Sequence, residues 1–419
     1  MKITILSVGT RGDVQPYIAL GLGLRAVGHD VQIATPSNFE EFVRSSGLGY
    51  TRLEANFREL METSLMQEMM TSHNPLKSYR ETRKLIHYIL ECFAADSWKA
   101  CQNSDAIIFS TIAVTGYSVA EKLGLPSCWA PLQPMSRTRA FPSVVSPIQS
   151  SQNGTLNWFT HILEEQATWQ PARNFINQWR SDFLGLKPFP FSGPYDLLEK
   201  KHFPIIYGYS PTILPKPSDW GDWIHVSGYW FLYHPAEWQP PAELVNFIQA
   251  GKPPIYVGFG SMNSREAREL TQIVIDAVTL AKERAVFATG WGSLADVTLP
   301  DTIYKVDTIP HDWLFPQLSA AVHHGGAGTI AAAIRAGIPS IIVPHITDQM
   351  FWGKQAFDLG VGTQPIQRKK ITAKNLADSI RAVINDKEMR QRAIVLGKHI
   401  NAEDGVSKAV ELISRHLFN

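Results

Sequence analysis

The sequence predicts an α/β protein made of two doubly wound domains, in which parallel strands are covered on both faces by helices. Three observations support this fold class. The chain has 419 residues, whereas a single hydrophobic core rarely grows beyond about 250 to 300 residues. Short apolar runs alternate with helical segments in both halves, as βαβ units require. A glycine-rich turn over 323–329 follows one such run and precedes a helical segment.

The first half opens with an expected strand, turn and helix. Residues 2–8 form a β-branched run that stops at Gly9. Apolar residues then recur at helical spacing from Pro16 to about Val27, with Pro16 suited to the first helical turn and Gly28 to the helix end. The other elements expected here are strands over 31–34, 105–110, 126–130 and 205–209 and a helix over 115–123.

The second half repeats this alternation. Expected strands cover 255–259, 285–289, 303–306, 320–323 and 340–343, and a last helix covers about 404–417. The segment 228–241 is rich in proline and aromatic residues and has no periodicity, which is typical of a linker. We therefore expect a first domain over 1–227, a linker over 228–241, a second domain over 242–400 and a terminal helix within 401–419.

Composition excludes several classes of function. With 39 Lys+Arg against 38 Asp+Glu, the chain lacks the basic excess of nucleic-acid-binding proteins. No apolar run reaches the roughly 18 residues of a membrane span, and Arg11 and Asp13 come too early for a signal peptide. Because Cys92, Cys101 and Cys128 form no C-x-x-C pair, we expect a reducing, cytoplasmic environment without a disulfide framework.

The turn His323-His-Gly-Gly-Ala-Gly-Thr329 is the strongest candidate site. Glycines between a strand and a helix let backbone N–H groups approach an anion, and the helix dipole favours negative charge there. A pyrophosphate cradle, with His324 as a further donor, is one interpretation. The other is a tight turn with two core histidines. A G-x-G-x-x-G fingerprint is absent after the first strand, which weakens an NAD or FAD hypothesis.

Two carboxylates follow other expected strands. Asp13 lies in the turn Gly9-Thr-Arg-Gly-Asp-Val-Gln-Pro16, where it can act as a general base or complement the helix dipole, or both. Asp348 and Gln349 follow the strand 340–343 and offer acceptors and donors for vicinal hydroxyls.

Because ligands of doubly wound sheets lie beyond the carboxyl ends of the strands, we expect the site in the cleft between the domains. No metal site is expected, since D-x-D and H-x-x-x-H are missing.

Aromatic residues are concentrated in one part of the chain. Seven of the 12 tryptophans fall between Trp158 and Trp238. This concentration suits a wall for a large apolar ligand or contact with a membrane surface, where tryptophan is favoured. An ordinary core is the alternative.

Five motifs together resemble the sterol 3-β-glucosyltransferase branch of the UDP-glycosyltransferases. They are the turns 9–16 and 323–329 quoted above, Ala288-Thr-Gly-Trp-Gly292, Ile309-Pro-His-Asp-Trp-Leu-Phe-Pro316 and Asp348-Gln-Met-Phe-Trp-Gly353. The resemblance implies a glycosyltransferase B fold, with an acceptor-binding first domain, a nucleotide-sugar-binding second domain and a terminal helix that returns to the first. It also implies inverting transfer from UDP-glucose, as co-substrate, without a metal or other cofactor.

The resemblance also assigns roles to residues. Asp13 matches the general base, and His324 matches a catalytic group that holds the leaving phosphate. The other expected donor-binding residues are Gly12, Ser261, Thr308, Ile309, Pro310, Gly325, Gly326, Gly328, Thr329, Asp348 and Gln349. Among these, 308–310 matches a uracil-contacting turn, Ser261 a phosphate contact, and Asp348 with Gln349 the glucose-binding pair.

The chain departs from plant-type relatives at two positions. No histidine lies between Gly9 and Pro16, and Ala332 stands where a ribose-binding glutamate is expected. We expect a glucosyltransferase acting on a bulky apolar acceptor, with a sterol as first choice and peripheral membrane contact as a further expectation. The alternatives are a macrolide, polyketide, flavonoid or triterpenoid acceptor, a UDP-sugar epimerase, or a non-catalytic lipid- or nucleotide-binding protein.

Overall fold

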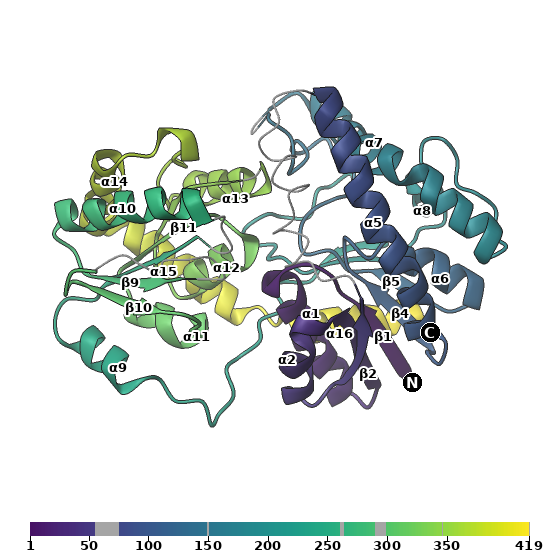
Figure 1. Cartoon of the computed structure of the whole chain (residues 1–419), viewed down its shortest axis with the longest axis horizontal. Helices are drawn as coiled ribbons and strands as arrows, with labels where there is room; N and C mark the ends of the chain where they lie inside the picture. Colours follow the sequence, from purple (N-terminus) through teal and green to yellow (C-terminus); the bar gives the residue numbers. More distant parts are fainter. Residues whose placement is uncertain (55–74, 149–150, 260–263, 290–298, 346, 419) are drawn as a thin grey trace. The chain divides into compact units, whose positions relative to one another are not determined.

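The computed structural model divides the chain into two compact units. It describes residues 1–54, 75–148, 151–259, 264–289, 299–345 and 347–418, with the backbone alone for 75–86, 264–267 and 347. The first unit comprises Met1–Pro211, Pro215–Leu232 and Asp404–Asn419, and the second comprises Thr212–Leu214 and Tyr233–Glu403. Each unit has its own parallel sheet with helices packed against it (Figure 1).

The first sheet has seven parallel strands in the order β3-β2-β1-β4-β5-β6-β7. They are β1 (Lys2–Leu6), β2 (Asp30–Pro36), β3 (Gly49–Leu53), β4 (Ala106–Phe109), β5 (Ser127–Trp129), β6 (Ile205–Tyr207) and β7 (Ile224–Val226). The chain runs outward from β1 through β2 to β3 and then returns to β4 on the other side of β1. This reversal makes the ends of β1 and β4 the place where a ligand is expected.

Helices complete the first unit, and one of them comes from the end of the chain. They are α1 (Arg11–Ala26), α2 (Glu40–Ser45), α5 (Pro75–Cys101), α6 (Thr115–Leu123), α7 (Gly154–Gln178), α8 (Tyr195–Lys200) and α16 (Gly405–Leu417). Helix α16 packs directly on α1 (Figure 1). A Cβ at Gly23 of α1 would lie 2.4 Å from Cγ1 of Val406 in α16, so glycine permits this close approach.

The second sheet has five parallel strands in the order β10-β9-β8-β11-β12. They are β8 (Ile255–Gly258), β9 (Ala285–Ala288), β10 (Ile303–Val306), β11 (Ala320–His323) and β12 (Ser340–Ile342). The helices are α9 (Ala242–Gln249), α10 (Ser264–Ala281), α11 (His311–Leu314), α12 (Ala327–Arg335), α13 (Thr347–Asp358), α14 (Ala373–Asn385) and α15 (Lys387–Ala402). The strand order reverses between β8 and β11, so the turn after β11 lies at a ligand-binding position.

The fold class predicted from the sequence is confirmed, with three local differences. Strand β3 was not predicted because only its last residue, Leu53, is buried at this sheet edge. Strand β7 was missed because, of its three residues, only Ile224 is buried. Helix α1 begins at Arg11, so the prediction that Pro16 lies in the first helical turn is wrong. Within 228–241, Trp230 is buried in the first unit and its ring packs edge-on against Tyr17.

Within the parts of the chain that the structure describes, every helix is too short or too polar to span a bilayer.

The contact between α1 and α16 predicts the effect of Gly23→Ala. Alanine favours a helix over glycine, but its Cβ overlaps Val406, and such overpacking typically costs about 1 to 3 kcal/mol. The variant should therefore unfold at lower urea concentration than the unmodified protein. Val406→Ala removes the overlapping methyl group, so the double variant should recover most of the loss. Equal midpoints for Gly23→Ala and the unmodified protein would contradict this packing.

Candidate active site

Asp13 lies inside the first turn of α1, and its carboxylate is held by the residue that precedes the helix. The backbone N–H of Thr10 donates to Oδ2 of Asp13 at 2.7 Å, and the Thr10 hydroxyl donates to the same atom at 2.9 Å. The Ser7 hydroxyl donates to the Asp13 carbonyl at 2.7 Å. These bonds explain why the helix begins five residues earlier than Pro16 suggests. The interpretation of Asp13 as a helix-entry carboxylate therefore agrees with the geometry.

Gly9 allows the chain to turn tightly around this carboxylate. Its φ of +138° belongs to the region that favours glycine. A Cβ at this position would lie 2.4 Å from Oδ2 of Asp13. Glycine after β1 therefore leaves the room that the Asp13 carboxylate occupies.

Burial raises the pKa of Asp13, and the hydrogen bonds from Thr10 oppose this rise. The pKa of Tyr17 is also raised, first by burial and then by the nearby Asp13 carboxylate. The Tyr17 hydroxyl donates to the Ala130 carbonyl at 2.6 Å. Asp13 is consequently a stronger base than an ordinary aspartate.

The glycine turn of the second unit starts from a buried histidine. His323 ends β11 with no exposed surface, and its Nδ1 accepts the Gly325 N–H at 3.1 Å. Gly325 has a φ of +93°, and a Cβ there would lie 2.8 Å from the Gln349 carbonyl oxygen. The turn after β11 therefore packs against the first turn of α13, which carries Asp348 and Gln349.

His324 is half-buried and neutral. Burial lowers its pKa to about 4, and the nearby Gly258 carbonyl opposes this fall. A Cβ at Gly326 would lie 2.5 Å from Nε2 of His324, so glycine at 326 makes room for the ring. A neutral imidazole can still donate one N–H to an oxyanion.

Helix α12 begins with Gly326 at the N-cap, where no side chain can cap it, and has no acidic residue in its first turn. Gly328 is exposed, and a Cβ added there would meet nothing within 4 Å. Thr329 is half-buried in the same turn. No carboxylate of the first turn therefore neutralises the positive end of the helix dipole, and the space next to Gly328 is open. Phosphate groups bind at helix N-termini of this kind.

Asp348 and Gln349 differ in their surroundings. Gln349 is buried, and its Oε1 accepts the His345 N–H at 2.8 Å. Asp348 is half-buried in the first turn of α13. Both residues lie in the element that packs on Gly325, so the structure brings them beside the glycine turn.

The remaining predicted residues are scattered through other loops. Thr308 is exposed, Ile309 is buried in the core of the second unit, and Pro310 precedes α11. Gly12 is exposed in the first turn of α1. Ser261 lies outside the described residues.

His345 is a neighbour of this site that the motifs do not identify. Its ring centroid lies 6.4 Å from that of His324, and Nη1 of Arg368 donates to its Nδ1 at 3.2 Å. Burial lowers the pKa of His345 to about 3, with Arg368 and His324 contributing. The only signal in the sequence is its place in the loop after an expected strand.

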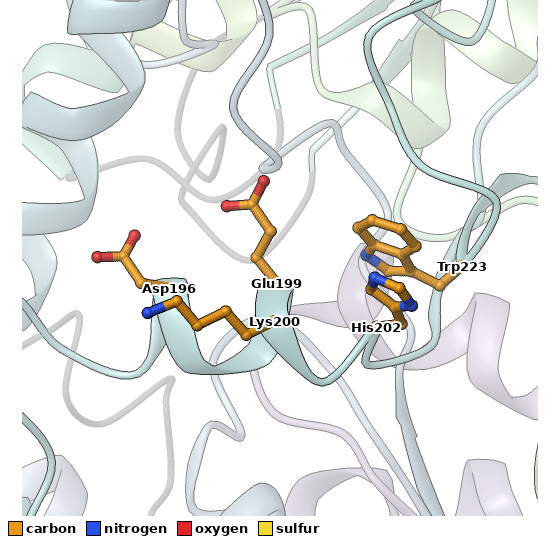
Figure 2. Close-up of a pocket in the computed structure, with 5 residues that line it drawn as sticks. All are labelled: Asp196, Glu199, Lys200, His202 and Trp223. Atoms are coloured by element: carbon orange, nitrogen blue, oxygen red, sulfur yellow. The ribbon is translucent and has the colours of Figure 1, made fainter.

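A separate hollow of about 410 Å³ lies on the first unit. It is lined by Asp196, Glu199, Lys200, His202 and Trp223, with the His202 and Trp223 rings stacked 4.0 Å apart (Figure 2). None of the predicted site residues lines it. Among the residues whose side chains are described, no group of three His, Cys, Asp or Glu is arranged to hold a metal ion.

Two family models match the chain. Residues 3–142 match the glycosyltransferase family 28 N-terminal domain, and residues 273–411 match the erythromycin biosynthesis protein CIII-like C-terminal domain. The chain is also similar to a sterol 3-β-glucosyltransferase of Emericella nidulans, with 38% identity over 429 aligned residues. That match covers all of this chain and 30% of the relative, so the chain spans less than a third of that protein's length.

Solved structures with the same fold share little sequence with the chain. The calicheamicin glycosyltransferase gives a TM-score of 0.71 at 15% identity, covering 99% of this chain and 98% of the other. The glycosyltransferase VinC, in complex with dTDP, gives a TM-score of 0.65 at 19% identity, covering 100% and 99%. These likenesses show the glycosyltransferase B fold.

The bonds to Asp13 predict the effect of Thr10→Val, which removes one donor and keeps the backbone N–H. The pKa of Asp13 should rise further, as a carboxyl NMR titration can measure. A raised folded-state pKa stabilises the fold below the unfolded-state value, and this stabilisation is lost as pH rises through the folded-state value. In Thr10→Val, this stabilisation should therefore be lost at a higher pH than in the unmodified protein.

Thr35→Val provides a matched control, because the buried Thr35 hydroxyl has no partner among the described residues. It should leave the Asp13 titration unchanged. An unchanged titration in Thr10→Val would instead show that the hydroxyl does not stabilise the carboxylate.

Proposed function

The chain belongs to the UDP-glycosyltransferase superfamily, in the branch similar to the sterol 3-β-glucosyltransferases, and from this premise we propose that it transfers glucose from UDP-glucose to a hydroxyl of a bulky apolar acceptor. A sterol is the first choice of acceptor. The main structural support is the uncapped start of α12 beside neutral His324, at the reversal point of the second sheet.

On the donor side, the diphosphate of UDP-glucose lies at the start of α12. Backbone N–H groups of Gly326 and Gly328, the Thr329 hydroxyl and the His324 imidazole donate to its oxygens. These groups are held before the reaction begins, and such preorganised donors usually give the largest catalytic contribution. The dTDP bound by VinC, a protein of the same fold, supports a nucleoside diphosphate as ligand.

The rest of the donor is held by loops around the same turn. Asp348 and Gln349 hydrogen-bond the glucose hydroxyls, while the backbone over 308–310 contacts the uracil. We also assign Ser261 to the phosphates and Gly12 to the donor, on the resemblance of their motifs. No metal enters this scheme, because helix and imidazole donors meet the charge of the leaving group.

On the acceptor side, Asp13 acts as the general base. Its carboxylate takes the proton of the acceptor hydroxyl as that oxygen attacks the anomeric carbon. The bond between that carbon and the diphosphate oxygen breaks, and UDP leaves with the electron pair. One displacement of this kind inverts the anomeric configuration. The raised pKa of Asp13 brings its basicity nearer to neutral pH.

A second candidate acceptor is an aglycone of the antibiotic type. The solved glycosyltransferases of calicheamicin and kitacinnamycin share the fold at 15% and 17% identity. The sterol enzymes are similar at 38% identity over the whole chain, which favours a sterol. Mass spectrometry of products from a mixed sterol, macrolide and flavonoid panel with UDP-glucose and competing donors decides between them. Release of a free epimerised UDP-sugar without acceptor would instead support an epimerase.

Asp13→Asn should abolish most of the transfer while leaving donor binding intact. Asparagine keeps the shape of the side chain but cannot accept the hydroxyl proton, and loss of a general base typically lowers the rate roughly 10² to 10⁴-fold. The measurement is the initial rate of glucoside formation together with UDP affinity by calorimetry. If the variant kept more than a few per cent of the rate with normal UDP affinity, Asp13 would not be the base.

Gly328→Ala separates folding from donor binding at the start of α12. The added Cβ meets no protein atom within 4 Å, and alanine favours a helix by up to roughly 1 kcal/mol over glycine. The variant should therefore be at least as stable as the unmodified protein. Its UDP affinity should fall roughly tenfold or more, because the methyl group displaces a charge-assisted hydrogen bond of about 1.5 to 3 kcal/mol. Unchanged affinity would exclude this turn as the phosphate site.

A further inference from the structure

Helix α7 exposes an apolar stripe on the surface of the first unit. Leu156, Phe159 and Leu163 lie three and four residues apart, so they share one face of the helix. Their exposed fractions are 37%, 53% and 53%. Such a contiguous exposed stripe is uncommon on a soluble protein and marks an interaction surface.

The carboxylates of the same helix are on its inner side. Glu164 is buried and accepts a hydrogen bond from the Ser143 hydroxyl. Glu165 is buried and accepts from Arg137 at 2.6 Å. These are the only carboxylates in α7. The usual arrangement of an amphipathic helix is therefore reversed along this stretch, because its acids face the protein and its large apolar residues face outward.

The stripe continues beyond Leu163 through a neighbouring loop. Gln166 and Gln170 carry on the same spacing, and their side-chain amides donate to the carbonyls of Ser192 and Phe191 at 2.9 and 3.0 Å. This anchors Phe191, whose side chain is 72% exposed. Leu156, Phe159, Leu163 and Phe191 together are called the α7 ridge.

One arginine, Arg173, stands beside the ridge at Phe191, and a second, Arg139, stands beside Trp158 of the same helix. The Arg139 guanidinium lies 5.6 Å from the Trp158 ring centroid, and that of Arg173 lies 4.5 Å from the Phe191 ring centroid. Within the described side chains, neither guanidinium is within ion-pair distance of a carboxylate. Cationic heads beside exposed aromatic and aliphatic groups match the headgroup and acyl layers of a bilayer with anionic lipids.

We propose that the α7 ridge, with Arg139 and Arg173, binds the surface of an anionic lipid bilayer. The apolar side chains enter the boundary between headgroups and acyl chains, and the two guanidinium groups contact lipid phosphates or carboxylates. The biological reason rests on the proposed function, because a sterol acceptor resides in a membrane. The binding itself requires neither donor nor acceptor and can be measured without them.

The test is sedimentation of the full chain with vesicles of phosphatidylcholine alone or mixed with phosphatidylserine. Phe159→Ser with Leu163→Ser should weaken binding to the mixed vesicles roughly tenfold or more. Arg139→Gln with Arg173→Gln should weaken it by a similar factor and remove the preference for phosphatidylserine. Leu280→Ser is the matched control, because Leu280 of α10 is 52% exposed in the second unit, and it should bind like the unmodified protein. Thermal melts establish that each variant is folded.

Three results would overturn the proposal. They are equal binding of the serine double variant and the unmodified protein, an equal loss in Leu280→Ser, and a dimer in solution that the serine substitutions dissociate.

Transfer to a detergent-dispersed acceptor should survive in both double variants, whereas transfer to an acceptor embedded in vesicles should fall. If vesicle binding behaves as stated but no acceptor is glycosylated, the proposed function fails and the bilayer contact stands.

Discussion

Helix α12 starts with no side-chain cap and with no acidic residue in its first turn, and the proposed donor chemistry depends on this. The start of α1 is the opposite case, since Asp13 lies in its first turn and complements the positive end of that helix. Both helices follow a strand at the point where the strand order reverses. One helix end is therefore occupied by an internal carboxylate, whereas the other has no such carboxylate in its first turn, as the proposed phosphate site requires.

The three histidines near the start of α12 add no formal charge to the proposed anion site. His323, His324 and His345 all have lowered pKa values, mainly because they are buried. They are neutral at physiological pH and can act only through N–H donors and ring nitrogen acceptors. A diphosphate in the proposed position would be held by oriented dipoles, which need no reorganisation when charge moves onto the leaving group. This explains how a chain with a formal net charge of +1 can suit a highly charged donor.

The sequence predicts the buried strands and the glycine turn well, because both depend on local patterns. Strands β11 and β12 are apolar runs, and the glycines at 325 and 326 are needed for a positive φ and for the room around His324. The start of α1 was not predicted, because the bonds between Thr10 and Asp13 outweigh the helix-start signal of Pro16. The pairing of Gly325 with Gln349 joins segments that are distant in sequence, so no local pattern reports it. The roles of Asp13, Asp348 and Ser261 come from resemblance and stay predictions.

Helix α7 is not among the elements predicted from the sequence, and the placement of its side chains shows why. A periodicity argument assumes that apolar residues face the core, but here Glu164 and Glu165 take inward positions and are held by Ser143 and Arg137. Burial raises the pKa of Glu164 to about 7, so this carboxyl can be protonated near neutral pH and needs no cation of its own. The inner face is thereby able to hold polar groups, and the outer face can be apolar. The helix packs on the unit through these hydrogen bonds and through Trp169, Ala172 and Ile176, which are buried in the hydrophobic core, while its exposed stripe would gain stabilisation from an apolar phase. A bilayer provides such a phase, and the cationic groups of Arg173 and Arg139 favour an anionic one.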